Sequence, residues 1–273
     1  MLQISGLFIY PIKSLAGISV KSALVTPTGF EYDRRWMLVD ESFKFISQRE
    51  MSNLALMEVA ILSNGLLVTF LNKNIHIPFQ PINNQKFIKV TIWDDTCEAQ
   101  IVGVEFDTWF SECLKIKCHL VYMPDHCKRQ VDERYAKPGI ITSFSDAYPF
   151  LLIGQSSLDE LNSRLEVPIA MNRFRPNIVF TGGQNYEEDT IAHMNVNGLD
   201  FFGVKLCARC NVITIDQASA TISKEPLKTL AGYRQKNNKI YFGQNLTHIG
   251  DGCISIGDKI TILARNTEER FIV

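Results

Sequence analysis

The segment Cys207-Ala208-Arg209-Cys210 carries two thiols three positions apart with an arginine between them. Cysteines at this spacing have three common chemical meanings. They form half of a structural zinc site, a reversible dithiol, or the source of one thiolate ligand for a soft transition metal. Two buried structural cysteines are a fourth interpretation, and the pair alone does not separate the four.

The residues around this pair favour the single thiolate ligand. A zinc site needs a second pair of Cys or His, and the rival cluster is Cys118-His119 with His126-Cys127. A thioredoxin-like dithiol opens a helix, whereas the β-branched run 211–215 predicts a strand directly after Cys210. An arginine beside a sulfur lowers the pKa of the thiol and favours the ionised ligand. Structural cysteines remain the main alternative.

Three further motifs place positive charge beside predicted strands. Lys13 and Ser14 follow one strand, Asp33-Arg34-Arg35-Trp36 leads into a second, and Arg173-Phe174-Arg175-Pro176-Asn177 leads into a third. A guanidinium binds phosphate through a planar fork, and an ammonium acts as a mobile point charge. Each motif alone fits a solvated strand end. Their recurrence in a chain with a reactive cysteine predicts a site for an anionic cofactor.

Composition limits what else the chain can be. Its 273 residues are 46% hydrophobic, which supports a buried core and excludes global disorder. The 28 Lys and Arg residues nearly balance 29 Asp and Glu residues, so we expect no nucleic-acid-binding or membrane-coating surface. No run approaches the roughly 18 apolar residues of a membrane span, and the N-terminus does not resemble a secretory signal. Seven cysteines without such a signal predict a reducing, cytoplasmic location.

Short β-branched and aromatic runs predict a chain made mostly of strands. The predicted strands are 2–10, 18–26, 36–40, 58–63, 66–70, 87–93, 150–153, 177–181, 211–216, 239–242 and 254–263. Asn64-Gly65 and Asn197-Gly198 predict hairpins, because both residues of such a turn take positive φ. Strands of this kind with few helices predict a β-rich α+β fold built on a barrel.

Three helices are predicted among these strands. Residues 105–116 place apolar side chains on one helical face, and 228–234 form a short helix. Another begins at Ser157, which with Glu160 makes a capping-box pattern. The charged segment 123–142 is punctuated by Pro and Gly and predicts an exposed connection. We therefore expect two domains, residues 1–122 and 123–273.

The motifs together resemble a known family. Tyr10-Pro11-Ile12-Lys13-Ser14, Asp33-Arg34-Arg35-Trp36 and Phe45-Ile46-Ser47-Gln48-Arg49-Glu50 resemble the β-barrel domain that precedes a MOSC domain. The later motifs resemble the MOSC domain itself, and they occupy residues 144–149, 173–177, 207–210, 224–227 and 242–245. The functional relatives are the mitochondrial amidoxime-reducing component and its bacterial homologues. The resemblance implies a β-barrel MOSC domain after a smaller β-barrel-like N-terminal domain, with few helices.

The resemblance also implies a molybdenum cofactor, in which a molybdopterin dithiolene and one protein cysteine hold the metal. The second cysteine of the motif, Cys210, maps to that ligand, and Cys207 does not. The residues that map to positions holding the pterin and its phosphate are Lys13, Ser14, Arg34 and Arg175. Ser145, Asp146 and Asn177 lie in the same cofactor motifs. Asp146 either relays a proton or holds a hydrogen bond, and Arg209 either tunes the thiolate or packs.

The implied activity is the reduction of N-hydroxylated compounds such as amidoximes and hydroxylamines. The sequence has no iron–sulfur ligand set, so we expect a separate electron donor of ferredoxin or flavin reductase type. It begins at a predicted strand, so we also expect no membrane anchor. One departure is Asp146-Ala147, where mitochondrial members carry Thr-Ser. The alternative function is a non-catalytic molybdenum-cofactor carrier or a sulfur-handling protein with a cysteine persulfide.

Overall fold

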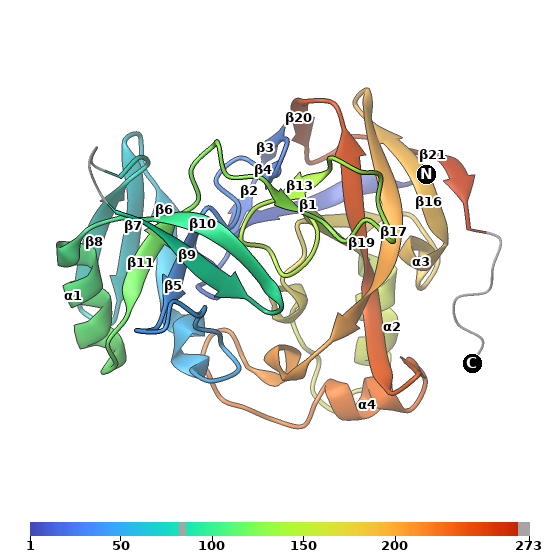
Figure 1. Cartoon of the computed structure of the whole chain (residues 1–273). Coiled ribbons are helices and arrows are strands. Elements are labelled where there is room, and N and C mark those ends of the chain that lie inside the picture. The colour runs from blue at the N-terminus through green and yellow to red at the C-terminus, as the bar shows by residue number, and fades with distance from the viewer. Residues whose placement is uncertain (82–85, 267–273) are drawn as a thin grey trace.

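The computed structural model describes residues 1–81 and 86–266 (Figure 1). Strands dominate this part of the chain, and four α-helices accompany them. The helices are α1 (Val104–Leu114), α2 (Gln155–Ser163), α3 (Glu187–Thr190) and α4 (Leu227–Ala231). The β-rich α+β class with few helices is confirmed. No helix within the described ranges has the length and apolar content that a bilayer crossing requires.

The largest sheet has nine strands and draws on both ends of the sequence. In spatial order these are β2 (Ile18–Val20), β1 (Gln3–Ile9), β15 (Ile178–Thr181), β14 (Phe150–Gly154), β19 (Lys239–Ile249), β17 (Leu199–Arg209), β16 (Ile191–Val196) and β21 (Ile260–Arg265), with β18 (Gln235–Lys236) beside β19. Strand β1 pairs antiparallel with β15, with Leu7 opposite Ile178. The N-terminal strands β1 and β2 therefore lie in a sheet whose other strands all come from residues beyond 149.

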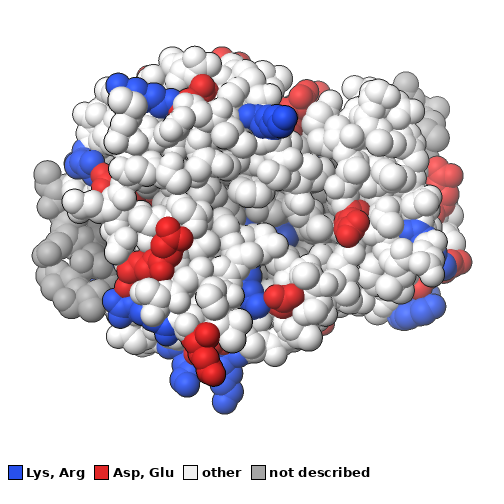
Figure 2. All heavy atoms as spheres, turned by 180° about the vertical axis from the view of Figure 1, so that it is seen from behind, with Lys and Arg blue, Asp and Glu red and all other residues white. Residues whose placement is uncertain are grey.

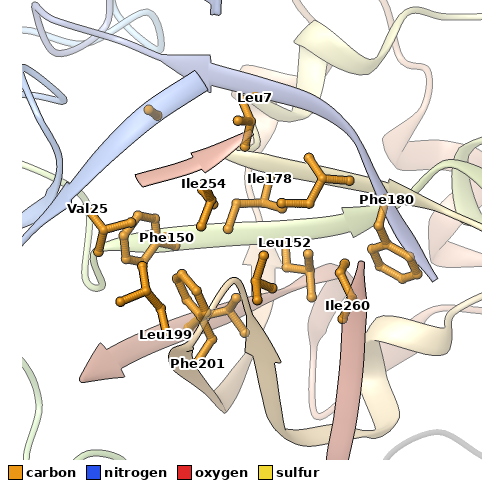
Figure 3. Close-up of a cluster of buried hydrophobic side chains, with 14 of the residues drawn as sticks. Leu7, Val25, Phe150, Leu152, Ile178, Phe180, Leu199, Phe201, Ile254 and Ile260 are labelled. Atoms are coloured by element: carbon orange, nitrogen blue, oxygen red, sulfur yellow. The ribbon is translucent and has the colours of Figure 1, made fainter. Parts of the chain in front are cut away.

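The core of this sheet is apolar and aromatic (Figure 3). Leu7, Ile178 and Phe201 are fully buried, and they come from β1, β15 and β17. Phe150 packs edge-to-face with Phe201, their ring centroids 5.5 Å apart. Successive side chains of a strand point to opposite faces of the sheet, so β1 buries one of its faces in this core. The residues that follow β1 then leave the sheet toward the rest of the molecule.

Two smaller sheets and α1 form the other end of the molecule, at the left of Figure 1. One is β5 (Trp36–Val39), β11 (His119–Tyr122), β10 (Asp95–Ile101) and β9 (Phe87–Ile92). Another is β6 (Glu58–Ile61), β7 (Gly65–Phe70) and β8 (Lys73–Pro78). The remaining strands are β20 (Gly252–Ser255), β3 (Ser22–Thr26), β4 (Gly29–Phe30), β12 (Arg129–Gln130) and β13 (Ile141–Thr142). Helix α1 buries Phe106 and Phe110 against the Trp36 cluster.

Two predictions about local structure were wrong. Residues 211–216 do not form a strand, because Asn211–Thr214 is a 3₁₀ turn in which the Thr214 hydroxyl donates to the Asn211 carbonyl. The turn buries Ile213 in the apolar cluster around Phe174 and Phe242, so tertiary packing overrides β propensity. Helix α2 exists, but it begins at Gln155 and has no capping box. The Ser157 hydroxyl instead donates to Glu188.

The two Asn-Gly hairpins form for different reasons. At Asn197 and Gly198 both φ angles are positive, and Val196 pairs with Leu199 as expected for a two-residue turn. The hairpin at Asn64-Gly65 also forms, but neither residue has positive φ. Gly65 is needed there because a Cβ atom would lie 2.2 Å from the carbonyl oxygen of Ile77 on β8.

The segment 123–142 is not simply exposed. It contains β12 and β13, which pair with each other, and its residues Arg129 and Val131 are buried. The prediction of an exposed connection was wrong for residues 127–131, where alternate residues pack inward while their neighbours face solvent. A domain boundary near residue 122 stays a prediction.

Glu188 is an ionisable residue on α3 that is buried where this helix packs against the large sheet. Its side chain is fully buried, and it accepts a hydrogen bond from the Ser157 hydroxyl at 2.8 Å. Burial, together with the neighbouring charge of Asp189, raises the pKa of Glu188 to about 8. The folded state therefore holds a proton that the unfolded chain releases above its ordinary pKa of 4.5.

Folding stability should consequently fall as pH rises from 5 toward 8, because the folded state binds more protons than the unfolded state over that range. Glu188→Gln should remove this slope and exceed the wild type by about 4 kcal/mol at pH 8. Urea unfolding at pH 5.5, 7 and 8.5 measures it, with the exposed Glu58→Gln as control. An unchanged slope in Glu188→Gln would contradict the assignment.

Candidate functional site

A cavity of about 540 Å³ is lined by residues from both halves of the chain. This volume falls within the roughly 300–1,000 Å³ of small-molecule sites. The candidate residues from the sequence all line it, and they are Lys13, Ser14, Arg34, Ser145, Asp146, Arg175, Asn177, Arg209 and Cys210. Cys207 lines it as well. The structure thus brings together residues separated by up to about two hundred positions in sequence.

Strand β17 carries the two cysteines to this cavity. Its pairing with β19 continues to Arg209 opposite Ile240, so the pair lies at the end of a strand. Cys210 follows the strand with extended backbone, and its carbonyl accepts from the amide of Ile213 in the 3₁₀ turn. The buried Ile213 anchors that turn, so the half-buried Cys210 thiol is held at the cavity wall.

Arg209 contacts Cys207 rather than Cys210. Its guanidinium donates to the Cys207 sulfur at 3.0 Å and to the Phe174 carbonyl oxygen at 2.8 Å. Burial raises the pKa of the Cys207 thiol, and the arginine charge opposes that rise. The geometry therefore supports a role for Arg209 in holding Cys207.

Two guanidiniums of the cavity lining stack on one buried tyrosine ring. Arg34 lies 4.2 Å and Arg175 lies 4.3 Å from the ring centroid of Tyr10. The Tyr10 hydroxyl donates to the carbonyl of Pro176 at 3.0 Å. Asp33 is buried, accepts from the Tyr10 amide at 2.8 Å and pairs with Arg34 at 2.6 Å. Cation–π contact with one ring and the carboxylate of Asp33 together hold these two like charges near one another.

Asn177 joins the two halves of this cluster. Its side-chain oxygen accepts from Arg34 at 3.0 Å, and its amide nitrogen donates to the Phe8 carbonyl on β1 at 3.2 Å. Burial lowers the pKa of Arg175 to about 10, which still leaves it charged at neutral pH. The cavity therefore presents permanent positive charge to an incoming anion.

Three cavity residues have left-handed backbone conformations. The φ angles are 72° at Ser14, 49° at Arg34 and 55° at Arg175. For a residue with a Cβ atom this region costs about 1 kcal/mol or more. Non-glycine residues held this way cluster at functional sites, where the surrounding structure fixes an otherwise unfavourable geometry. Here the three left-handed residues place the Ser14 hydroxyl and the Arg34 and Arg175 guanidiniums in the lining of one cavity.

Lys13 and Asp146 form an ion pair on the cavity wall. The Lys13 ammonium donates to Asp146 at 2.6 Å and to the Phe144 carbonyl at 2.8 Å. Burial lowers the pKa of Lys13 to about 8, although the Asp146 charge opposes this. Desolvation would raise the pKa of Asp146, but Lys13 and a hydrogen bond from Trp93 hold it well below its usual range. An ionised Asp146 supports the hydrogen-bonding role.

Arg129 supports the loop that carries Ser145 and Asp146. Its buried guanidinium donates to the carbonyls of Ser143 at 3.0 Å and Ser145 at 2.6 Å. It also pairs with Asp95 on β10 at 2.7 Å. Sequence reasoning missed Arg129 because it treated segment 123–142 as solvated. The alternation that places Cys127, Arg129 and Val131 inward could have indicated it.

The mouth of the cavity has an aromatic wall that sequence reasoning also missed. Trp93, in the turn between β9 and β10, donates its ring N–H to Asp146 at 3.2 Å. The Arg49 guanidinium lies 4.1 Å from its ring centroid, and Phe45 packs edge-to-face at 4.7 Å. An exposed tryptophan with positive φ at a hairpin tip is the feature that could have drawn attention to it.

Charge elsewhere on the molecule is mixed. Figure 2 shows acidic and basic side chains interspersed over one face. Cations outnumber carboxylates among the charged cavity residues, which include Lys13, Arg34, Arg49, Arg175, Arg209, Lys239 and Asp146. Within the described residues, no group of three or more His, Cys, Asp or Glu side chains could hold a metal ion. A cavity lined by cysteine thiols and several cations fits a soft metal that brings most of its ligands on an anionic organic group.

The chain matches two families of known domains. Residues 1–117 match the MOSC N-terminal beta barrel domain, and residues 141–261 match the MOSC domain. It is 30% identical to mitochondrial amidoxime-reducing component 1 of Mus musculus, over 96% of this chain and 82% of that protein. Identity to the Homo sapiens protein of that name is 29%, over 96% and 83%. The molybdenum cofactor sulfurase of Solanum lycopersicum is 28% identical over 94% of this chain, but only 35% of that protein.

Two Asp–Arg pairs of equal length allow the buried cluster to be tested. Asp33–Arg34 and Asp125–Arg35 are each 2.6 Å long, but the Asp33 side chain is 1% exposed and that of Asp125 is 84% exposed. Asp33→Asn should lower the free energy of unfolding by about 3 kcal/mol, because it leaves Arg34 without its buried counter-charge. Asp125→Asn should cost less than about 1 kcal/mol. Chemical denaturation measures both, and equal losses would show that the buried carboxylate has no special role.

Proposed function

Since the chain belongs to the family of MOSC-domain proteins that carry an N-terminal MOSC beta barrel domain, we propose that it binds the molybdenum cofactor in the 540 Å³ cavity and reduces N-hydroxylated compounds. Amidoximes and hydroxylamines are the substrate class. The observation that carries the proposal is the convergence of Cys210 with three cations, which are Lys13, Arg34 and Arg175.

Seven of the residues that line the cavity would hold the cofactor or the backbone around it. Cys210 would supply the protein thiolate, and the guanidiniums of Arg34 and Arg175 would bind the phosphate of the pterin. Lys13 and the Ser14 hydroxyl would add to this phosphate-binding group, and Asn177 and Ser145 would hold the backbone around the cavity in place. When bound, the cofactor supplies the two-electron redox chemistry, and the protein supplies binding, orientation and access.

Cys210 rather than Cys207 is the proposed ligand. The Cys207 sulfur already accepts a hydrogen bond from Arg209, and burial raises the pKa of its thiol. A raised pKa disfavours the thiolate that metal binding requires. Cys210 lies past the end of β17, at the start of the turn that Ile213 anchors.

Electrons would come from a separate protein of ferredoxin or flavin reductase type. A ferredoxin-type cluster needs four cysteine ligands, and the described residues contain no metal-binding group of even three acidic, His or Cys side chains. The substrate would enter at the mouth formed by Trp93 and Arg49, where the aromatic wall stays partly exposed. A cytoplasmic location stays a prediction.

A second candidate is a cofactor carrier or a sulfur-handling protein with a cysteine persulfide. The similarity to a protein named molybdenum cofactor sulfurase favours it, since that similarity covers 94% of this chain. A carrier would transfer the cofactor to an apo-enzyme and would not reduce benzamidoxime with an artificial electron donor. The reductase would turn over benzamidoxime, so this one assay separates the two.

Serine variants of the two cysteines test the ligand. Cys210→Ser should lower benzamidoxime reduction by more than the roughly 10–100-fold typical of losing an outer partner of a metal site, with unchanged circular dichroism. Cys207→Ser is the matched control and should retain activity within about tenfold of the wild type. Full activity in Cys210→Ser would rule out this residue as the ligand.

A further inference from the structure

Cys97 and Cys127 lie opposite each other outside the cofactor cavity. The start of β10 and the segment after β11 run antiparallel, and two polar contacts set their register. Glu98 binds His126 at 2.8 Å, and Asp95 binds Arg129 at 2.7 Å. Each contact joins residues one or two positions from a cysteine, so the same register places Cys97 opposite Cys127.

The two cysteines also share one packing environment. Both side chains pack in the apolar cluster that contains Val90, Val121 and Phe144. Directly opposed residues of two antiparallel segments have Cα atoms about 4.5–5.5 Å apart, which falls within the range that disulfides span. The pair is therefore placed to form a disulfide.

The environment makes the two sulfurs unequal. Interaction between the two thiols lowers the pKa of Cys127 to about 7, and it raises the pKa of Cys97 well above its usual range. Cys127 is therefore the better nucleophile at neutral pH. Cys127 also lines a second cavity of about 1,040 Å³, distinct from the cofactor site, which offers a path for a small reagent.

We propose that Cys97 and Cys127 form a reversible disulfide when the protein meets a low-molecular-weight disulfide such as oxidised glutathione. The Cys127 thiolate attacks one sulfur of the reagent, and the other sulfur leaves as a thiolate. Cys97 then loses its proton and attacks the Cys127 sulfur, which releases the second small thiol. Two protein thiols are oxidised, and one small disulfide is reduced to two thiols.

A disulfide between Cys97 and Cys127 would affect the loop beside the cofactor cavity. Arg129 follows Cys127 by two residues and holds the carbonyls of Ser143 and Ser145 in the loop beside the cofactor cavity. A disulfide would tie the strand that carries Asp95 to the segment that carries Arg129. The disulfide would thus restrain Arg129, which holds the loop beside the cofactor cavity, although neither cysteine lines that cavity. Its formation does not depend on the proposed reductase activity.

Thiol mapping of the full-length protein tests this. Reduced wild-type protein is exposed to oxidised glutathione, free thiols are blocked with N-ethylmaleimide, and the chain is cut with trypsin and chymotrypsin. Chymotrypsin cuts at aromatic residues between Cys97 and Cys113 and at Tyr122, between Cys118 and Cys127. We expect a cross-linked peptide pair with Cys97 and Cys127, which dithiothreitol separates.

Variants define the order of the two steps. Cys97→Ser should stop at a mixed disulfide between Cys127 and glutathione, and Cys127→Ser should leave Cys97 unmodified. The exposed Cys253→Ser is the control and should form the Cys97–Cys127 link as the wild type does. Wild-type protein in which Cys97 and Cys127 both stay alkylated, or link to other cysteines instead, would overturn the proposal.

Discussion

Two guanidiniums stack on the ring of one buried tyrosine, and the cavity depends on keeping them there. Arg34 and Arg175 would repel each other in a low-dielectric wall without compensation. The ring of Tyr10 and the buried carboxylate of Asp33 supply that compensation at 4.2, 4.3 and 2.6 Å. The arrangement leaves the site with more positive charge than it neutralises internally. An anionic ligand completes it.

This cluster exists only because the first strand of the chain joins the main sheet. Pairing of β1 with β15 places Tyr10 beside the residues that lead into β15. Asn177 reinforces the junction, since the Phe8 amide donates to its backbone carbonyl and its own side chain donates to the Phe8 carbonyl. Lys13, Ser14 and Arg34 then reach the cavity from the N-terminal side, while β17 delivers Cys210 from the other. The left-handed residues lie where these elements meet.

The sequence predicted the β-rich class because its β-branched and aromatic runs are short and separated by turn residues, and that class is confirmed. It also nominated residues that all line one cavity, since a thiol, an ammonium and guanidiniums are recognisable by type. It could not show that Tyr10 organises the guanidiniums or that Arg129 holds the Ser145 loop, because both depend on contacts across more than a hundred positions or within a segment that looks solvated. The predicted strand at 211–216 failed because the burial of Ile213 selects a 3₁₀ turn. Likewise, the contact between Arg209 and Cys207 is set by side-chain geometry that spacing does not reveal.

The central claim is that the cavity holds a molybdenum atom on an anionic pterin. Elemental analysis and pterin fluorescence of wild-type protein, purified from a host that makes the cofactor, test it most directly. The account predicts molybdenum and pterin in equal amounts, approaching one of each per chain, and their joint loss from a protein in which Arg34 and Arg175 are both replaced by alanine. Zinc in place of molybdenum, or a wild-type protein that carries neither metal nor pterin, would contradict it.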